Sequence, residues 1–268
     1  MLIELATPPV TSPERATILS LHVSLGSYQA FQDALIDAAH RGESRTACFA
    51  NVHMTVEAQR DPAFAQVVNS ADWVCTDGLP LTWAMRLLHK RQQDRVTGPD
   101  TLHNMVKRAA EEGLPIFFYG STPDVLAKAV ATCRDRYPSI QIAGTIAPPF
   151  RSLTPDEEEQ IIYQINQSGA RLVFVALGCP KQERWMAQMR GRVQAVMLGI
   201  GGGLPILAGV QTRPPVWIQR LGMEWLYRLA LEPRRLFKRY AVTNSLYGWY
   251  LCKQWANKQW PTPISYNE

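Results

Sequence analysis

Short apolar runs alternate along the chain with longer segments in which apolar residues recur every three or four positions. The short runs are rich in β-branched residues, which is typical of buried strands, whereas the longer segments have the period of amphipathic helices. This alternation predicts an α/β fold of the doubly wound, Rossmann-like type, in which a mainly parallel sheet carries helices on both faces. The predicted strands cover residues 18–23, 46–51, 72–76, 115–119, 140–144, 172–177 and 195–199.

The predicted helices lie between these strands, and two of them have clear start signals. Thr122 and Thr154 each precede a proline and acidic residues, so that a hydroxyl stands at the N-cap and acids lie near the positive end of the helix dipole. We predict one α/β body over residues 1–212, followed by a helical appendage over residues 213–268. The predicted helices of the body cover residues 27–40, 62–69, 80–90, 100–112, 123–137, 155–168 and 181–190.

Doubly wound folds bind ligands at the carboxyl ends of their strands, so the residues after each strand are the candidates for a site. Asp77 follows the third predicted strand and precedes Gly78. A carboxylate in this place is a natural general base, and at the ordinary aspartate pKa of about 4 it is ionised at neutral pH. The alternative is an aspartate that only accepts backbone N–H groups of its own turn. We assign Thr76, the last residue of the strand, to the same site.

Asn51 ends the second predicted strand, and Arg95 lies in a loop before a predicted helix. The amide of Asn51 can bond a sugar hydroxyl or the edge of a uracil, and a role in the turn fits the sequence equally well. The guanidinium of Arg95 can pair with a phosphate or a carboxylate.

Glycine turns follow three further strands. Gly120 opens directly into a capped helix, whose free N–H groups can hold a phosphate, although a plain turn that needs glycine is the alternative. Gly178 is followed by Lys181 and Gln182 at the start of a helix. A lysine there opposes the helix dipole, which favours an anion in front of it; an exposed lysine without a role is the alternative.

The third glycine turn contains Gly199, Gly201 and Gly202. Their spacing is not that of the dinucleotide fingerprint G-x-G-x-x-G, so a hydride-transfer cofactor is not indicated. Backbone that is nearly free of side chains can still approach a phosphate or a sugar closely.

Other common chemistries have no motif in this sequence. There is no D-x-D and no clustered set of His, Asp and Glu, so we expect no metal and no other cofactor. No serine has the G-x-S-x-G context of a hydrolase, and the five histidines are isolated from one another.

The predicted appendage differs from the body in charge and in tryptophan content. It holds nine Lys/Arg and three acids, a net charge of +6, whereas the first 212 residues hold 19 basic and 20 acidic residues, a net charge of −1. Tryptophan prefers a membrane–water interface, and clustered cations are drawn to anionic headgroups, so this segment predicts work at a membrane surface. Five of the eight tryptophans lie in it: Trp217, Trp225, Trp249, Trp255 and Trp260.

We predict no membrane-spanning helix near the carboxyl end of the body and no signal peptide at its amino end. Residues 193–212 are uncharged and long enough to cross a bilayer, but five glycines and a proline argue against a spanning helix. The first 18 residues lack the basic and apolar regions of a signal peptide. We therefore expect a cytoplasmic protein that is peripheral on the inner face of the cell membrane.

Taken together, these segments resemble the WecG/TagA/CpsF family of glycosyltransferases (glycosyltransferase family 26). The resemblance covers roughly residues 18–240 and rests on seven short motifs in the order of the family. They are Ala50-Asn51, Thr76-Asp77-Gly78, the run from Arg95 to Asp100, the Tyr119-Gly120 turn, the run from Gly178 to Glu183, the run from Gly199 to Gly202, and the run from Glu224 to Leu229 with Glu232-Pro233-Arg234-Arg235.

The resemblance implies an inverting, metal-independent hexosyltransferase. Such enzymes move a sugar (of the N-acetylmannosamine type, its uronic acid or a hexose) from a UDP-sugar to a polyprenyl-diphosphate-linked sugar, in the synthesis of cell-envelope polysaccharide. It implies that Asp77 deprotonates the acceptor hydroxyl and that Asn51 and Gln182 line the pocket. It also implies that three basic residues of the appendage clamp the acceptor diphosphate: Arg228, Arg235 and Lys238.

Two positions depart from the family pattern. Phe49 stands where the family often has a threonine, which removes a hydroxyl beside the expected active site. Lys238 stands in place of an arginine, which replaces a bidentate fork by a point charge.

A different class of function is also compatible with the sequence. The chain would then be a non-catalytic nucleotide- or lipid-binding protein whose appendage only tethers it to a membrane surface. Nucleic-acid binding through the basic appendage is less consistent with the sequence, because its cations recur beside Leu, Trp and Tyr, and we expect no nucleic-acid partner. A homo-oligomer is compatible with the sequence.

Overall fold

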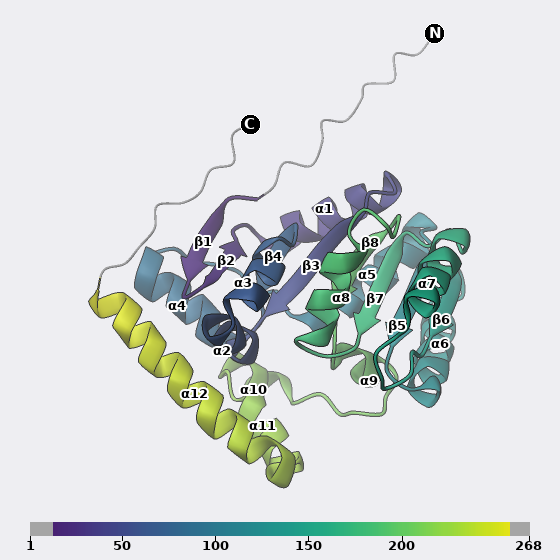
Figure 1. Ribbon diagram of the computed structural model, residues 1–268. Helices are drawn as coiled ribbons and strands as arrows, with labels where there is room; N and C mark the ends of the chain where they lie inside the picture. Colours follow the sequence, from purple (N-terminus) through teal and green to yellow (C-terminus); the bar gives the residue numbers. More distant parts are fainter. Residues whose placement is uncertain (1–12, 258–268) are drawn as a thin grey trace.

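The structure is a computed structural model that describes residues 13–257 of the 268-residue chain (Figure 1). In this part of the chain, six strands form one parallel sheet in the order β4-β3-β8-β7-β5-β6, and β1 and β2 form a separate antiparallel hairpin. The predicted α/β, doubly wound fold is confirmed. The strands are β1 (Arg15–Ile18), β2 (Leu21–Ser24), β3 (Arg45–Ala50), β4 (Trp73–Thr76), β5 (Ile116–Gly120), β6 (Ile142–Ile146), β7 (Leu172–Ala176) and β8 (Val196–Gly199).

Helices cover both faces of the sheet, because successive side chains of each strand point to opposite sides. In β3, Cys48 and Ala50 belong to one core, and Ala47 and Phe49 belong to the other. The first core also contains buried residues of α2, α3, α4, α7 and α8, and the second contains those of α1, α5, α6 and α9. These helices are α1 (Tyr28–His40), α2 (Val52–Arg60), α3 (Pro62–Asn69), α4 (Leu79–His89), α5 (Gly98–Glu112), α6 (Pro123–Arg136), α7 (Pro155–Gln167), α8 (Lys181–Met189) and α9 (Gly203–Leu207).

The start signals at Thr122 and Thr154 are confirmed as N-caps. The Thr122 side chain accepts a hydrogen bond from the N–H of Val125. Thr154 forms a full capping box with Glu157, in which each side chain accepts from the other residue's backbone N–H.

Near the amino end the structure differs from the prediction in one strand and in one helix that was not predicted. Residues 18–23 are not one strand of the sheet, because the chain reverses at Leu19 and Ser20 and pairs β1 with β2. Leu19 has a φ of 54° there, and the turn has no glycine or asparagine that would have predicted it. The helix α2 was also not predicted, although its N-cap is Asn51, one of the residue types that start helices.

Three helices follow the body at the carboxyl end. They are α10 (Val216–Arg220), α11 (Glu224–Leu231) and α12 (Pro233–Ala256), and Figure 1 shows α12 as the long helix at the lower left edge. The helix α12 packs against α2 and α4. Its Tyr247 hydroxyl donates to the carbonyl of Pro80 at 3.0 Å, and its Gln254 side chain accepts from the N–H of Leu19 at 3.0 Å.

The uncharged residues 193–212 form β8 and α9 and so belong to the core of the body. Of the helices in residues 13–257, none combines the length and apolarity that crossing a membrane requires. Trp260 and residues 1–12 lie outside the described residues, and the domain boundary at residue 212 stays a prediction.

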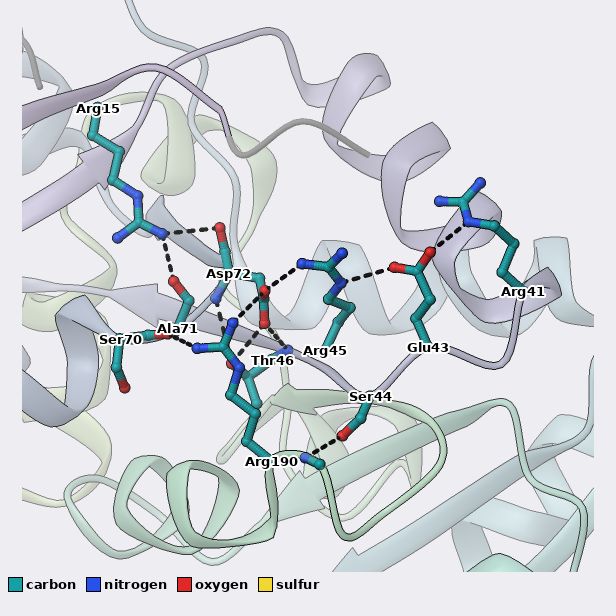
Figure 2. Close-up of polar contacts among 11 residues, drawn as sticks. Arg15, Arg41, Glu43, Ser44, Arg45, Thr46, Ser70, Ala71, Asp72 and Arg190 are labelled. Carbon is teal, nitrogen blue, oxygen red and sulfur yellow. Dashed lines mark hydrogen bonds and ion pairs between the residues drawn. The ribbon is translucent and has the colours of Figure 1, made fainter. Parts of the chain in front are cut away.

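A polar network fixes the amino-terminal ends of β3 and β4 (Figure 2). The predicted site lies at the opposite, carboxyl-terminal ends of the same strands. Asp72 is buried and accepts from Arg45 at 2.9 Å, from Arg190 at 2.8 Å and from the N–H of Thr46 at 2.8 Å. Arg15 donates to backbone carbonyls of the same loop. Since the buried Asp72 is surrounded by cations, its charge is compensated where water is excluded.

Candidate active site

A pocket of about 590 Å³ lies at the carboxyl ends of β3, β4, β7 and β8. The body and the appendage form its two sides. The body contributes Asn51, Asp77, Arg95, Gly178, Gln182, Gly199, Gly201 and Gly202, among others. The appendage contributes Arg213, Glu224, Arg228, Arg239, Tyr240 and Tyr247, among others.

Asp77 lies in this pocket directly after β4. Its backbone N–H donates to the carbonyl of Ala50 at 2.7 Å, which ties it to the end of the neighbouring strand. Gly78 has a φ of 114°, so only glycine makes the sharp turn into α4 without strain. Within the described residues the carboxylate of Asp77 has no hydrogen-bond or ion-pair partner, so the alternative of an aspartate spent on its own turn does not hold here.

Burial raises the pKa of Asp77 to about 7. The positive charge of Arg95 acts in the opposite direction, and the negative charge of Glu224 raises the pKa further. The expectation of an ordinary aspartate pKa near 4 is therefore wrong. The physical reason is that the end of β4 and the appendage remove most of the water around this carboxylate.

Arg95 faces the pocket from the loop before α5 and contacts the appendage. Its Nη2 donates to Glu224 Oε2 at 2.8 Å, and its Nη1 donates to the carbonyl of Gln219 at 3.1 Å. From the sequence we expected Arg95 to pair with a phosphate or a carboxylate, and in the structure it pairs with the carboxylate of Glu224.

The other pocket arginines differ in whether an acid neutralises them. Arg213 pairs with Asp100 at 2.6 Å. Arg228 and Arg239 have no carboxylate partner within residues 13–257. An Nη1 of Arg228 lies 4.0 Å from the position of a Cβ built on Gly202, which places a free cation beside the glycine turn after β8.

Arg239 lies over the ring of Tyr240, with its guanidinium carbon 5.3 Å from the ring centroid. His53 lines the same part of the pocket, and its buried Nδ1 has no hydrogen-bond partner in the described chain. Burial lowers the pKa of His53 and the charge of Arg239 lowers it further, whereas the charge of Glu57 acts in the opposite direction. His53 follows the strand end at Asn51 by two residues, but the sequence did not favour a catalytic histidine, because all five histidines are isolated from one another.

Asn51 lines the pocket and also caps a helix. Its Oδ1 accepts from the N–H of Met54 at 3.1 Å, so the turn role that the sequence left open is present. Phe49, two residues earlier, is buried and packs edge-on against Phe31 with ring centroids 6.1 Å apart. The position where the family often has a hydroxyl is thus an apolar part of the pocket lining.

Gln182 joins two of the glycine turns. Its Oε1 accepts from the N–H of Gly178 at 3.1 Å, and its Nε2 donates to the carbonyl of Gly199 at 2.8 Å and to Glu183 Oε1 at 2.8 Å. A Cβ on Gly199 would lie 3.1 Å from Gln182 Nε2, which explains the glycine. Gln182 therefore lines the pocket with an amide whose donors and oxygen are already used.

Three residues of the body that were predicted for the site do not line the pocket. The Thr76 hydroxyl is buried and donates to the carbonyl of Asp94 at 2.9 Å, so it serves the fold. Gly120 has a φ of 110°, and a Cβ there would lie 2.6 Å from the carbonyl of Ala176, so this glycine is needed where β5 meets β7. Lys181 is exposed on α8 and outside the pocket lining, in agreement with the alternative of a lysine without a role there.

The predicted clamp in the appendage is only partly present. Arg228 lines the pocket, whereas Lys238 is exposed and does not. The side chain of Arg235 lies outside what the structure describes. The residues of α12 that line the pocket recur every three or four positions and include Leu236, Tyr240, Thr243 and Tyr247. With this helical spacing Arg239 lies on the pocket side of α12, and Lys238 points away from it.

Sequence reasoning missed Arg213, Arg239 and Glu224 as pocket residues. For Arg239 a signal existed, because it stands three residues after the apolar Leu236 and four before Thr243, which are neighbouring positions on a helix. For Glu224 and Arg213 the signal was absent, since their partners Arg95 and Asp100 are more than 100 residues away in the chain.

In the part of the chain that the structure describes, the arrangement combines an unpaired carboxylate with a raised pKa and two cations free of acidic partners. A carboxylate of this kind can accept a proton at neutral pH, and such cations can bind an anion or stabilise negative charge that develops in a reaction. In residues 13–257 no group of three or more His, Cys, Asp and Glu is placed to hold a metal ion. The metal independence of the chemistry stays a prediction.

Comparison with known families agrees with this geometry. A sequence profile described as the glycosyl transferase WecG/TagA/CpsF family matches residues 16–261, almost the whole chain and both sides of the pocket. The chain is thus a member of the WecG/TagA/CpsF family of glycosyltransferases.

Proposed function

We propose that this glycosyltransferase moves a hexose-type sugar from a UDP-sugar to a sugar on a polyprenyl diphosphate, with inversion and with Asp77 as the general base. The observation that carries the proposal is the carboxylate of Asp77. It has no partner within residues 13–257, its pKa is raised to about 7, and it shares a pocket with Arg228 and Arg239. A pKa close to the working pH is the optimum for a general base.

The proposed reaction is a single displacement. A hydroxyl oxygen of the acceptor sugar attacks the anomeric carbon of the donor, the bond from that carbon to the UDP oxygen breaks, and its electron pair leaves with UDP. Asp77 accepts the proton of the attacking hydroxyl. Attack on the face opposite the leaving group inverts the anomeric centre.

The leaving diphosphate gains negative charge in this step and needs fixed positive partners. The resemblance gave Arg228 to the acceptor diphosphate. We assign it to the leaving diphosphate instead, because it lies beside Gly202 and no carboxylate competes for it within the described chain. A guanidinium can donate two parallel hydrogen bonds to a phosphate.

The acceptor diphosphate needs a second cation, and Arg239 on α12 is the candidate. It lines the pocket from the appendage side and is likewise without an acidic partner in residues 13–257. We assign the side of the pocket near His53 and Arg239 to the acceptor and the side near Gly202 and Arg228 to the donor.

The membrane enters the proposal through the acceptor, whose polyprenyl chain stays in the bilayer. The appendage exposes large apolar side chains, with Trp217 at 59% and Trp249 at 67% of full exposure, next to its cations. Such side chains suit the interface of a cytoplasmic membrane leaflet, where the enzyme would build cell-envelope polysaccharide.

Phe49 bears on the donor sugar. Its ring offers no hydrogen bond where the family often has a hydroxyl, so this chain is suited to a donor that presents an apolar group there, such as the methyl of an acetamido substituent. An N-acetylmannosamine-type donor or its uronic acid fits this better than a plain hexose, because both carry the acetamido group.

The test is a panel of UDP-sugars and short-chain polyprenyl-diphosphate sugars incubated with the purified protein, with and without EDTA. The expected result is release of UDP and a lipid product heavier by one sugar, inverted at its anomeric carbon and unaffected by EDTA. Binding of UDP and of vesicles without turnover on any pair would instead support the non-catalytic alternative.

A further inference from the structure

The body helix α4 exposes two large apolar side chains that the pocket does not use. Trp83 is 53% exposed and Leu87 is 47% exposed, and they stand four residues apart on one side of the helix. Neither residue lines the pocket. The opposite side of α4 is buried through Leu81, Met85 and neighbouring residues, so the exposed side is the free surface of an otherwise well packed helix.

This surface is continuous with the start of the appendage. A Cβ built on Gly222 would lie 3.3 Å from Leu79 Cβ and 3.4 Å from Trp83 Cη2, so the turn after α10 rests directly on α4. Leu221, the residue before Gly222, is 57% exposed, and Trp217 on α10 is exposed as well. Tryptophans and leucines from two segments more than 120 residues apart thus form one apolar surface.

The charges on these two segments are all of one sign. Arg86, Lys90 and Arg220 are exposed there. Residues 79–91 and 214–223 contain no Asp or Glu. An apolar centre that carries Trp and Leu and is flanked by cations matches the interface of an anionic bilayer.

We propose that α4 and α10 together form a lipid-binding surface of this enzyme, specific for anionic headgroups. The inference rests on the proposed function in one respect, namely that the acceptor is held in the bilayer to which this surface binds. The body then contacts the membrane itself and is not merely tethered by its appendage.

Binding through this surface would also orient the pocket relative to the bilayer. Leu79 and Pro80, at the start of α4, line the pocket, and Trp83 follows Leu79 by one turn, a rise of about 6 Å along the helix. A bilayer that covers Trp83 and Leu87 therefore lies beside the opening between the body and the appendage. The diphosphate of a membrane-bound acceptor would reach Arg239 without leaving the headgroup region.

A second copy of the chain is the other occupant to consider. A two-fold dimer places the same patch of both copies face to face, so Arg86, Lys90 and Arg220 would meet their own equivalents without an acid of these segments between them. Charge complementarity thus favours an anionic lipid surface over self-association.

The experiment measures co-sedimentation of the full chain with vesicles of phosphatidylglycerol and phosphatidylcholine and with vesicles of phosphatidylcholine alone. The variant with Trp83→Ala and Leu87→Ala is expected to bind mixed vesicles about ten-fold or more weakly than the wild type. The variant with Arg86→Gln, Lys90→Gln and Arg220→Gln is expected to lose tens of fold on mixed vesicles and little on phosphatidylcholine. Tyr163→Ala is the matched control, since Tyr163 is similarly exposed on α7 at the other end of the sheet (Figure 1).

Circular dichroism and thermal unfolding check that the variants fold, and a water-soluble short-chain acceptor measures transfer without a bilayer. Transfer to that acceptor is expected to be unchanged in the Trp83/Leu87 variant.

Vesicle binding equal to the wild type would overturn the inference and leave the proposed function intact. A change of oligomeric state in light scattering, with vesicle binding unchanged, would also overturn it by assigning the surface to a second copy. If no acceptor is used by any form, the proposed function fails while the vesicle result still stands.

Discussion

Arg95 and Glu224 form an ion pair with an Nη2–Oε2 distance of 2.8 Å, although 129 residues separate them in the sequence. The same guanidinium donates to the carbonyl of Gln219 at 3.1 Å. An arginine of the α/β body therefore holds the appendage through one side chain and one backbone carbonyl. Both charges act on Asp77, since Arg95 lowers its pKa and Glu224 raises it. The contact thus connects closure of the pocket with the protonation of the proposed base.

The first prediction is that the pH dependence of kcat/KM changes when the ion pair of Arg95 and Glu224 is removed. For the wild type, kcat/KM should rise with pH through a midpoint near 7, because Asp77 must be ionised to act as a base and its pKa is about 7. Glu224→Gln removes a negative charge that raises this pKa, so the midpoint should move to lower pH. Glu112→Gln, in an ion pair with Arg108 far from the pocket lining, is the control and should leave it in place. A midpoint that is unchanged or higher in Glu224→Gln would contradict the coupling.

The second prediction concerns stability. The pKa of Asp77 is about 7 in the folded chain and 3.8 without the protein environment, so the folded chain binds the proton more tightly and loses stability as pH rises between these values. Asp77→Asn removes this penalty and should stabilise the protein at pH 8 by about 1–2 kcal/mol, since water in the pocket screens part of the full shift. That corresponds to roughly 2–4 °C in Tm for a chain of this length.

Thermal unfolding at pH 8 and at pH 4.5 checks the sign. The gain in Tm should shrink toward the lower pH, because Asp77 is then protonated in the folded wild type and the ionised fraction in the unfolded chain falls. A gain that is equal at both pH values, or a loss of stability at pH 8, is the contrary outcome.

The third prediction compares two neighbouring cations of α12. Arg239→Ala should raise the KM for a short-chain, soluble polyprenyl-diphosphate acceptor about ten-fold or more, because it removes a charge-assisted contact to the diphosphate. Lys238→Ala is the matched control and should stay within about two-fold with a short-chain soluble acceptor, since Lys238 is exposed and outside the pocket lining. Steady-state kinetics with varied acceptor measures both, and equal effects would refute the assignment of Arg239.

The fourth prediction concerns Gln182 as a positioning residue. Gln182→Ala leaves the N–H of Gly178 and the carbonyl of Gly199 without their partner, and buried groups left unpaired cost about 1–3 kcal/mol each. We expect a stability loss of about 2–4 kcal/mol in denaturant unfolding, together with slower turnover. Gln188→Ala on the exposed side of the same helix should change neither. A fully stable Gln182→Ala protein with raised substrate KM would instead make Gln182 a direct ligand.

The core of the fold was predictable because the strands from β3 onward, apart from the edge strand β6, are buried on both faces. Such strands appear as continuous apolar runs and the helices between them as periodic segments, so both signals are local. The hairpin of β1 and β2 was missed because its turn at Leu19 and Ser20 has no residue that favours a left-handed backbone. The turn is held instead by contacts from distant parts of the chain, among them the hydrogen bond from the N–H of Leu19 to Gln254 and the one from Asn69 to the carbonyl of Ser20.

The site was predictable where chain topology alone determines position. Asp77, Asn51 and Gly178 follow strands of one parallel sheet, and parallel strands bring their carboxyl ends together. The same rule placed Thr76 and Gly120 in the site, and there side-chain packing decided otherwise. The raised pKa of Asp77 was not predictable either, because the appendage that buries it begins more than 130 residues later.

The central claim is that Asp77 is the base of a glycosyl transfer in this pocket. The measurement that tests it most directly is turnover of wild type and Asp77→Asn with a UDP-sugar and a polyprenyl-diphosphate sugar, with UDP binding measured by calorimetry in parallel. We predict that Asp77→Asn turns over about 100-fold or more slowly than the wild type, a loss of the size attributed to general bases, while UDP binding stays within about three-fold. Turnover by Asp77→Asn at the wild-type rate would contradict the claim.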